Sequence, residues 1–183
     1  SWAVNNKLNR DSRNRFLLNA TIKYKFNDWL DADFRAGSDL YNTKFDSRTY
    51  TGSSLPNSYG VGSDNFNERN YIVSLNARKD NLFGKWNGSA SAFGQIMKQE
   101  SNWLSSSAGS LTVPNLFTIG NSEGNPGFSE GISEKQINSL FGTAELNYDN
   151  FWFINVTARN DWSSTLSKEN RSYFYPSIST SLV

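Results

Sequence analysis

The sequence of 183 residues contains no cysteine, no histidine and a single methionine. The absence of histidine excludes Ser-His-Asp and Cys-His catalytic groups and imidazole metal sites. The absence of cysteine excludes disulfides, zinc knuckles and thiol nucleophiles. The 18 basic and 17 acidic side chains leave a net charge of +1, which supplies no basic surface for nucleic-acid phosphates. We therefore predict that the chain is not an enzyme and does not bind nucleic acid.

Long hydrophobic runs are also missing, because no apolar stretch approaches the ~20 residues that a membrane helix needs. The hydrophobic fraction of 37% is low for a large core shielded from water. The aromatic fraction of 15% is nevertheless too high for a disordered chain. These features favour an all-β protein.

Apolar and polar residues alternate strictly along much of the chain. Between residues 15 and 26 every even position is apolar, including Phe16 and Ile22, and all odd positions except Leu17 are polar. Alternation with a period of two predicts a strand with one apolar and one polar face. Seven segments follow this pattern, at 15–26, 30–40, 69–79, 86–97, 137–148, 152–160 and 172–183, with a further short strand at Trp2–Val4.

The connections between these segments alternate in length. Short turns are expected at 27–29, 80–85 and 149–151, and long loops at 41–68, 98–136 and 161–171. Short periplasmic turns and long extracellular loops are typical of antiparallel transmembrane β-barrels. A soluble β-sandwich would also alternate, but its strands usually run about 5–6 residues. The predicted strands of about 10–12 residues instead suit a tilted crossing of ~25 Å of hydrocarbon.

Aromatic residues gather beside the short turns. Such residues are enriched where a membrane meets water. We predict interface positions for Phe26, Trp29, Trp86, Tyr148 and Trp152.

The alternation also predicts strand register, because like faces must stay together across a turn. Across the first turn it pairs Phe26 with Leu30, and it places two lysines opposite two aspartates, Lys25 with Asp31 and Lys23 with Asp33. Across the third turn the predicted pairs are Leu146 with Ile154, Glu145 with Asn155, Ala144 with Val156 and Phe141 with Arg159. The last pair permits a cation–π contact.

Several segments resemble the SusC/RagA family of TonB-dependent outer-membrane transporters. The similar segments are Arg13–Asn19 (RNRFLLN), Leu140–Tyr148 (LFGTAELNY), Asn155–Ser164 (NVTARNDWSS) and Tyr173–Ser177 (YFYPS). The resemblance implies a 22-stranded barrel in the outer membrane of a Gram-negative bacterium, with a plug, TonB coupling and a SusD-like surface lipoprotein. It also implies import of oligosaccharides or peptides. About seven to eight strands would form one arc, so residues 1–183 are assigned to the barrel domain, without the plug or TonB box.

Candidate substrate contacts fall into two groups. Sugars and peptides bind exposed rings, amides and charged groups. The loop group is Tyr50, Tyr59, Trp103, Phe117 and Phe128, and the group lining the barrel near its outer rim is Arg35, Asp39, Arg159 and Asp161.

Two alternatives remain open at this stage. No cofactor is expected, although the oxygen-rich segment Asp64–Glu68 could hold Ca²⁺ if it forms a loop. The chain could also belong to a small outer-membrane barrel that acts as an adhesin or structural anchor rather than as an importer.

Overall fold

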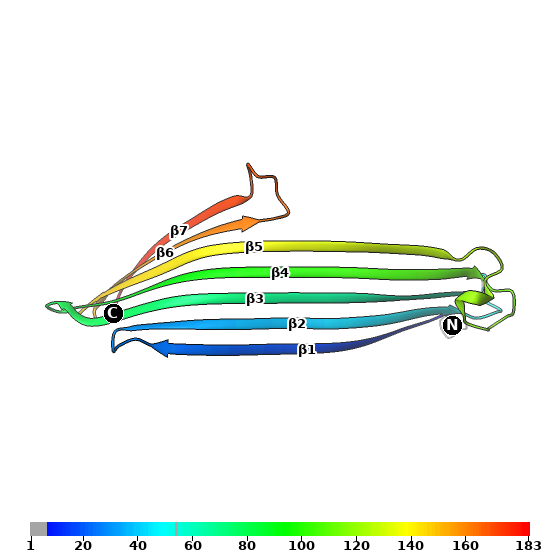
Figure 1. Ribbon diagram of the computed structural model, residues 1–183, viewed down its shortest axis with the longest axis horizontal. Helices are drawn as coiled ribbons and strands as arrows, with labels where there is room; N and C mark the ends of the chain where they lie inside the picture. Colours follow the sequence, from blue (N-terminus) through cyan, green and yellow to red (C-terminus); the bar gives the residue numbers. More distant parts are fainter. Residues whose placement is uncertain (1–6, 54) are drawn as a thin grey trace. The chain divides into compact units, whose positions relative to one another are not determined.

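The computed structural model describes residues 7–53 and 55–183, which form seven strands of one sheet. Each strand lies beside its neighbours in the sequence, in the order β1 to β7 (Figure 1). The predicted seven-strand, all-β architecture is thereby confirmed, and the predicted strand at Trp2–Val4 lies outside the described residues. The strands are β1 (Lys7–Lys25), β2 (Leu30–Thr49), β3 (Ser58–Phe83), β4 (Trp86–Ser110), β5 (Gly127–Tyr148), β6 (Trp152–Ser163) and β7 (Ser172–Leu182), with a 3₁₀ turn η1 at Ile119–Asn121.

The chain divides into two compact units, which are described separately below. The first unit combines the chain up to Leu17 with Asp39–Asn67 and Glu100–Glu134. The second unit combines Leu18–Ser38, Glu68–Gln99 and Lys135–Val183.

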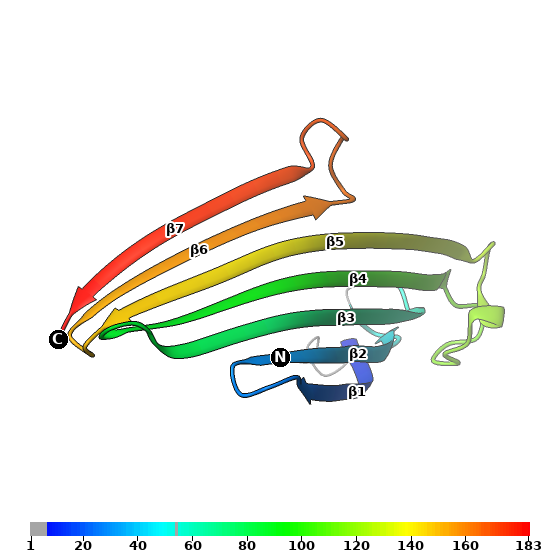
Figure 2. The same cartoon turned by 60° about the vertical axis from the view of Figure 1, so that its left-hand side comes forward.

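The strands extend well beyond the predicted ranges. β2 continues to Thr49, β3 begins at Ser58 and β4 continues to Ser110. The long loops predicted at 41–68 and 98–136 are therefore wrong, and the connections shrink to 50–57, 111–126 and 164–171, of which the last two are visible in Figure 2. These extensions carry polar residues on both faces, so they lack the alternation that reveals a strand with one apolar face.

The short turns adopt backbone conformations that suit their residues. Gly84, Asp149 and Asn150 have positive φ values of 63°, 51° and 54°. Glycine, asparagine and aspartate tolerate this region best, and tight hairpins require it. The turns predicted near 27–29 and 149–151 are confirmed, whereas the turn predicted at 80–85 is shorter because β3 continues to Phe83.

The predicted register of the hairpin at the third short turn is confirmed. Strands β5 and β6 are antiparallel, and their paired residues include Leu146 with Ile154, Ala144 with Val156, Glu145 with Asn155 and Phe141 with Arg159. In the first hairpin the Phe26 N–H donates to the Leu30 carbonyl at 3.0 Å, in agreement with the predicted pairing of these two residues.

Lys25 and Asp33, two of the charged residues that the predicted register places opposite an opposite charge, form their ion pairs with other residues. Lys25 binds Asp28 in the turn at 2.7 Å, and Asp33 binds Arg35 on its own strand at 2.6 Å. The Ser74 hydroxyl of β3 also donates to Asp33, and the Asn76 amide donates to Asp31 at 2.9 Å. Because β2 lies between β1 and β3, its carboxylates can bind groups of β3 as well as groups of β1 and of their own strand.

Burial is the reverse of that in a soluble domain. Ala108 and Leu111, with 3% and 7% exposure, are the only buried hydrophobic residues in the part of the chain that the structure describes. Phe16 and Ile22 are 64% and 68% exposed. The buried residues are mostly polar, namely Asp33, Thr43, Thr49, Ser74, Asn121 and Ser139. A soluble sandwich would bury the apolar side chains instead.

Two faces follow from this alternation. We call the even-numbered residues of every strand except β3 the apolar face, together with the odd-numbered residues of β3. The remaining strand residues form the polar face. Hydrogen bonds of Ser74 and Asn76 with aspartates of β2 lie on the polar face.

Candidate functional site

Phe117 lies at the centre of a group of side chains in the first unit, which we call the loop cluster: Arg48, Tyr50, Tyr59 and Phe117. The Tyr50 ring meets the Phe117 ring edge-on, with 4.8 Å between centroids, and the Tyr59 centroid lies 6.1 Å away. The Arg48 guanidinium lies 5.6 Å from the centre of the Phe117 ring. Three of the predicted loop residues are therefore brought together, and Arg48 is a member that the sequence did not reveal.

Two hydrogen bonds join the connections on either side of the loop cluster. The backbone N–H of Thr51 donates to the Asn115 side chain at 3.0 Å. The backbone N–H of Leu111 donates to the Asn57 side chain at 3.1 Å. Residues 50–57 and 111–126 thus hold each other in place, which fixes the side chain of Phe117 relative to Tyr50.

Asn121 organises the connection that carries Phe117. Its side-chain N–H groups donate to the carbonyls of Val113 and Leu116, both at 2.8 Å. Its side-chain oxygen accepts the backbone N–H of Val113 at 3.0 Å. Because Asn121 is buried, these bonds are shielded from competing water.

Three of the residues predicted to lie in loops belong to strands instead. Tyr59 lies in β3, Trp103 in β4 and Phe128 in β5. A Cβ atom on Gly131 would lie 2.5 Å from the Trp103 indole nitrogen, so the Trp103 ring covers this glycine. The missing side chain at Gly131 provides the space for the ring. Trp103 is not among the ring partners of Phe117.

The four predicted charged residues of the barrel lining form ion pairs. Arg159 and Asp161 bind each other at 2.8 Å, as two members of the predicted group. Arg35 binds Asp33, and Asp39 binds Arg15, both at 2.6 Å. These charges are therefore held in defined positions on the polar face.

A stack of rings lies on the polar face of the second unit. The rings of Phe93 and Phe141 are parallel, with 4.4 Å between centroids and 5° between planes. The Arg159 guanidinium lies 5.0 Å from the centre of the Phe141 ring, which confirms the predicted cation–π contact. The sequence analysis missed Phe93. Its ring follows Ser91 and precedes Gln95 on the polar face of β4, and a large aromatic residue among polar ones could have identified it.

A second stack lies on the polar face of the first unit. Tyr41 and Phe66 stack with 4.7 Å between centroids, and the Arg13 guanidinium lies 4.7 Å from the centre of the Tyr41 ring. The Arg13 Nε atom also donates to the Thr43 hydroxyl at 2.8 Å. This group was missed because residues 41–68 were interpreted as a loop, where alternation assigns no faces.

Aromatic residues surround the turns of the second unit. The Trp86 ring lies 5.1 Å from that of Tyr148 and 6.0 Å from that of Trp152. Phe26 and Trp29, beside the first turn, are exposed. Their proposed place at a membrane interface remains a prediction.

Ion pairs at the turns shift two pKa values in opposite directions. The Lys25 ammonium donates a hydrogen bond to Asp28, which lowers the pKa of that carboxyl. The Asp149 carboxylate accepts a hydrogen bond from Lys85 and raises the pKa of that amine. Both shifts favour the charged forms at neutral pH.

The acidic segment Asp64–Glu68 lies within β3, so its prediction as a loop was wrong. Asp64 accepts a hydrogen bond from Ser101 at 3.4 Å, and Glu68 accepts one from Asn70 at 2.7 Å. Over residues 7–53 and 55–183, no three acidic, cysteine or histidine residues gather in a group that could hold a metal ion.

Comparisons with known proteins show which known structures share this fold. Among the described residues, no helix has the length and apolar character to cross a membrane. No protein-family model and no curated protein matches the sequence. A solved structure of the RagAB peptide transporter, however, superposes with a TM-score of 0.86 over 97% of this chain, at 15% identity. The chain has the fold of a segment of this transporter.

Two further structures give the same result. The RagAB peptide importer matches with a TM-score of 0.79 and 18% identity in both its closed-closed and its open-open state. These matches cover 96% and 97% of this chain. In all three cases the chain spans about a fifth (20%) of the length of the chain it matches. The resemblance to the SusC/RagA family is thus confirmed at the level of the fold.

Proposed function

We propose that the chain is a segment of the barrel wall of a SusC-type, TonB-dependent importer in the outer membrane of a Gram-negative bacterium. The observation that carries this proposal is the exposed apolar face on a sheet whose fold matches the RagAB peptide transporter. Transport by such a wall involves binding and passage without covalent chemistry, and no cofactor is required.

The length of the apolar face supports the membrane assignment. Apolar residues occupy the even positions from Phe16 to Phe26, ten residue steps apart, and Trp86 to Ile96 repeats this spacing on β4. At ~3.3 Å per residue and a tilt of ~45°, ten steps span roughly 23 Å, which suits the ~25 Å apolar band of outer-membrane barrels.

The aromatic and arginine groups support a role in substrate contact. Planar rings stack on sugar rings and on aromatic side chains of peptides, and guanidinium groups bind carboxylates. The proposed cargo is therefore an oligosaccharide or a peptide. The RagAB structures, described as those of a peptide transporter and importer, favour peptides.

The proposed partners follow from the same fold. A SusD-like lipoprotein would cover the connections 50–57 and 111–126, which hold the loop cluster. TonB would act through a plug outside this chain.

The loop cluster offers a direct test in the full-length protein. Phe117→Ala removes the ring shared by Arg48, Tyr50 and Tyr59, and we expect slower uptake of labelled peptides at unchanged protein level in the outer membrane. Phe16→Ala is the matched control, because Phe16 is an exposed phenylalanine of the same unit that lies on the apolar face, outside the proposed substrate contacts. Deleting the whole gene is a broader test. If uptake of peptides and oligosaccharides were unaffected by the deletion, the importer assignment would be contradicted and the adhesin or anchor favoured.

A further inference from the structure

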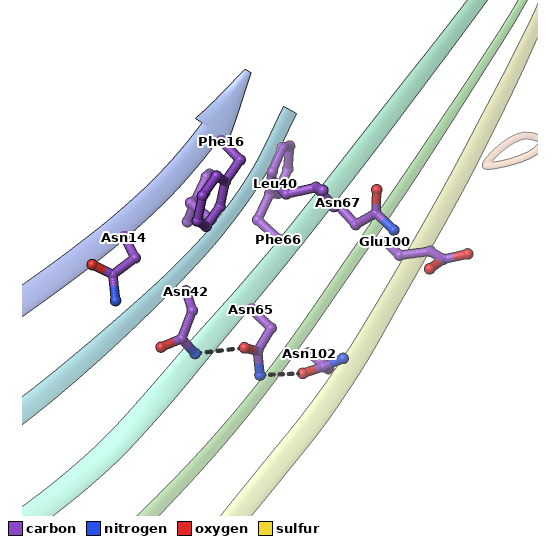
Figure 3. Close-up of a pocket in the computed structure, with 10 residues that line it drawn as sticks. Asn14, Phe16, Leu40, Asn42, Asn65, Phe66, Asn67, Glu100 and Asn102 are labelled. Atoms are coloured by element: carbon purple, nitrogen blue, oxygen red, sulfur yellow. Dashed lines mark hydrogen bonds between the residues drawn. The ribbon is translucent and has the colours of Figure 1, made fainter. Parts of the chain in front are cut away.

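A hollow of the first unit is lined mainly by residues of the apolar face, which supply eight of its ten lining residues; the other two, Tyr41 and Phe66, belong to the polar face. Its volume is about 330 Å³, at the lower end of the range for small-ligand sites. Phe16 and Leu40 provide its apolar part. Figure 3 shows the amide part, in which Asn42, Asn65 and Asn102 lie side by side on three strands.

The three asparagines form a hydrogen-bonded row. The Asn42 amide donates to the Asn65 side-chain oxygen at 2.6 Å, and the Asn65 amide donates to the Asn102 oxygen at 2.9 Å. Each bond uses one amide proton of its donor, so Asn42 and Asn65 each retain a second N–H, and Asn102 retains both. The row therefore presents several donors in a fixed arrangement.

The row lies where the apolar face changes its chemistry. Along β1 this face changes from Phe16 to Asn14, and along β2 from Leu40 to Asn42. From these residues to the short turn the same strands are apolar on this face, apart from Ser38 of β2. If the apolar face contacts lipid, the hollow lies at the border between acyl chains and head groups on the side away from the short turns.

The composition of the hollow selects among lipid head groups. Among its ten described lining residues none is lysine or arginine, and Glu100 is the only carboxylate. Cationic side chains would favour a phosphate at this position. Amides without cations instead suit the hydroxyl groups of a sugar, which both donate and accept hydrogen bonds.

We propose that this hollow binds a glycolipid of the outer leaflet, with an acyl chain against Phe16 and Leu40 and a sugar of its head group on the asparagine row. The inference rests on the proposed function in one respect, because it requires the apolar face to lie in the outer membrane. It adds a lipid site on the outside of the wall, separate from the path of the cargo.

The test uses the full-length protein, purified from outer membranes in mild detergent. Retained lipopolysaccharide and phospholipid are measured per protein by native mass spectrometry and fatty-acid analysis. The double variant Asn42→Leu/Asn102→Leu keeps the side-chain size and removes the amides. We expect it to retain at least about tenfold less lipopolysaccharide, as the loss of two or more hydrogen bonds implies.

Two controls separate the site from folding and from transport. Asn70→Leu makes the same change on the polar face of β3, and it should leave lipopolysaccharide retention unchanged. Peptide uptake should persist in both Leu variants, which shows that they are folded and inserted. Should the double variant fail to insert, Asn65→Ala breaks both bonds of the row with one smaller change and should show the same loss.

Three results would overturn the inference: equal lipopolysaccharide retention in the variants and the wild type, retention of phospholipid alone, or self-association of the protein through this face. Each would leave the importer assignment intact as long as uptake persists. Loss of uptake on gene deletion tests that assignment separately.

Discussion

Asparagine side chains hold the connections of this chain in place. Asn57 and Asn115 each accept a backbone N–H from the neighbouring connection, and Asn121 binds two carbonyls and one N–H. Apolar packing plays little part, since Leu111 is the one buried hydrophobic residue in these described connections. Short amide side chains can satisfy backbone groups that no strand neighbour reaches.

Replacing Asn121 should loosen the connection that carries Phe117. In Asn121→Ala the Val113 N–H loses its partner, and the carbonyls of Val113 and Leu116 each lose one of two hydrogen bonds. An unsatisfied buried group costs about 1–3 kcal/mol. We expect faster amide hydrogen exchange over residues 111–122 in the full-length protein. Asn125→Ala, at an exposed position of the same connection, should leave exchange unchanged. Unchanged exchange in Asn121→Ala would show that the connection is held by other contacts.

The ion pair of Lys85 gives a prediction about pH. Asp149 raises the pKa of Lys85, so the interaction is fully present below the ordinary pKa of lysine and is lost as pH rises through the raised value. In Asp149→Asn the pKa of Lys85 should fall toward its ordinary value, as measured by NMR titration of ¹³C-methylated lysines. Asp80→Asn removes another carboxylate near this end of β3, and the pKa of Lys85 should stay raised. A pKa that does not respond to Asp149→Asn would exclude the ion pair.

At the scale of elements, the hairpin of β5 and β6 depends on two residues with positive φ. Asp149 and Asn150 both adopt this conformation, and the side chain of Asn147 bonds to Asn150 from both its oxygen and its nitrogen. The turn fixes the register of every pair from Tyr148 with Trp152 to Ile137 with Ser163.

Substitution in this turn should be sensitive to backbone preference. Asn150→Val places a β-branched residue at φ 54° and should lower the free energy of unfolding by about 1–2 kcal/mol. Asn150→Gly should cost less, because glycine adopts positive φ without strain. The measurement is urea unfolding of the full-length protein in lipid vesicles, with Thr157→Val in the extended part of β6 as control. Equal stability of the two Asn150 variants would contradict the turn geometry.

The sequence predicted strands wherever the two faces differ in polarity. The turn at 149–151 and the β5–β6 register followed from alternation alone, since a one-residue shift would place Leu146 on the polar face. The extensions of β2, β3 and β4 did not follow, because their two faces are both polar.

The candidate site was predictable only in part. Exposed aromatic residues in expected loops identified Tyr50, Tyr59 and Phe117, which the structure gathers. Arg48 and the stack of Arg13, Tyr41 and Phe66 required knowledge of which strands continue and how they are paired. Contacts between residues distant in sequence depend on this register, which local patterns do not contain.

At the scale of the whole molecule, the central feature is the reversal of burial between the two faces. Polar residues such as Ser74 and Ser139 are buried, whereas large apolar residues such as Ile22 and Leu140 are exposed. In water, leaving this apolar area exposed costs about 25 cal/mol of free energy per Å². In a lipid bilayer the same exposure is favourable, and the match to the RagAB structures places this pattern on a transporter fold.

The most direct test of this account is a cysteine scan along β5, which the absence of native cysteine in this chain makes simple. Single cysteines from Leu140 to Tyr148 are labelled with a fluorophore in the full-length protein, reconstituted in vesicles. We expect the even positions to be quenched by a lipid-borne quencher and the odd positions by iodide in water, with a period of two. Quenching of the even positions by iodide and protection of the odd positions from it would contradict the claim that the apolar face contacts lipid.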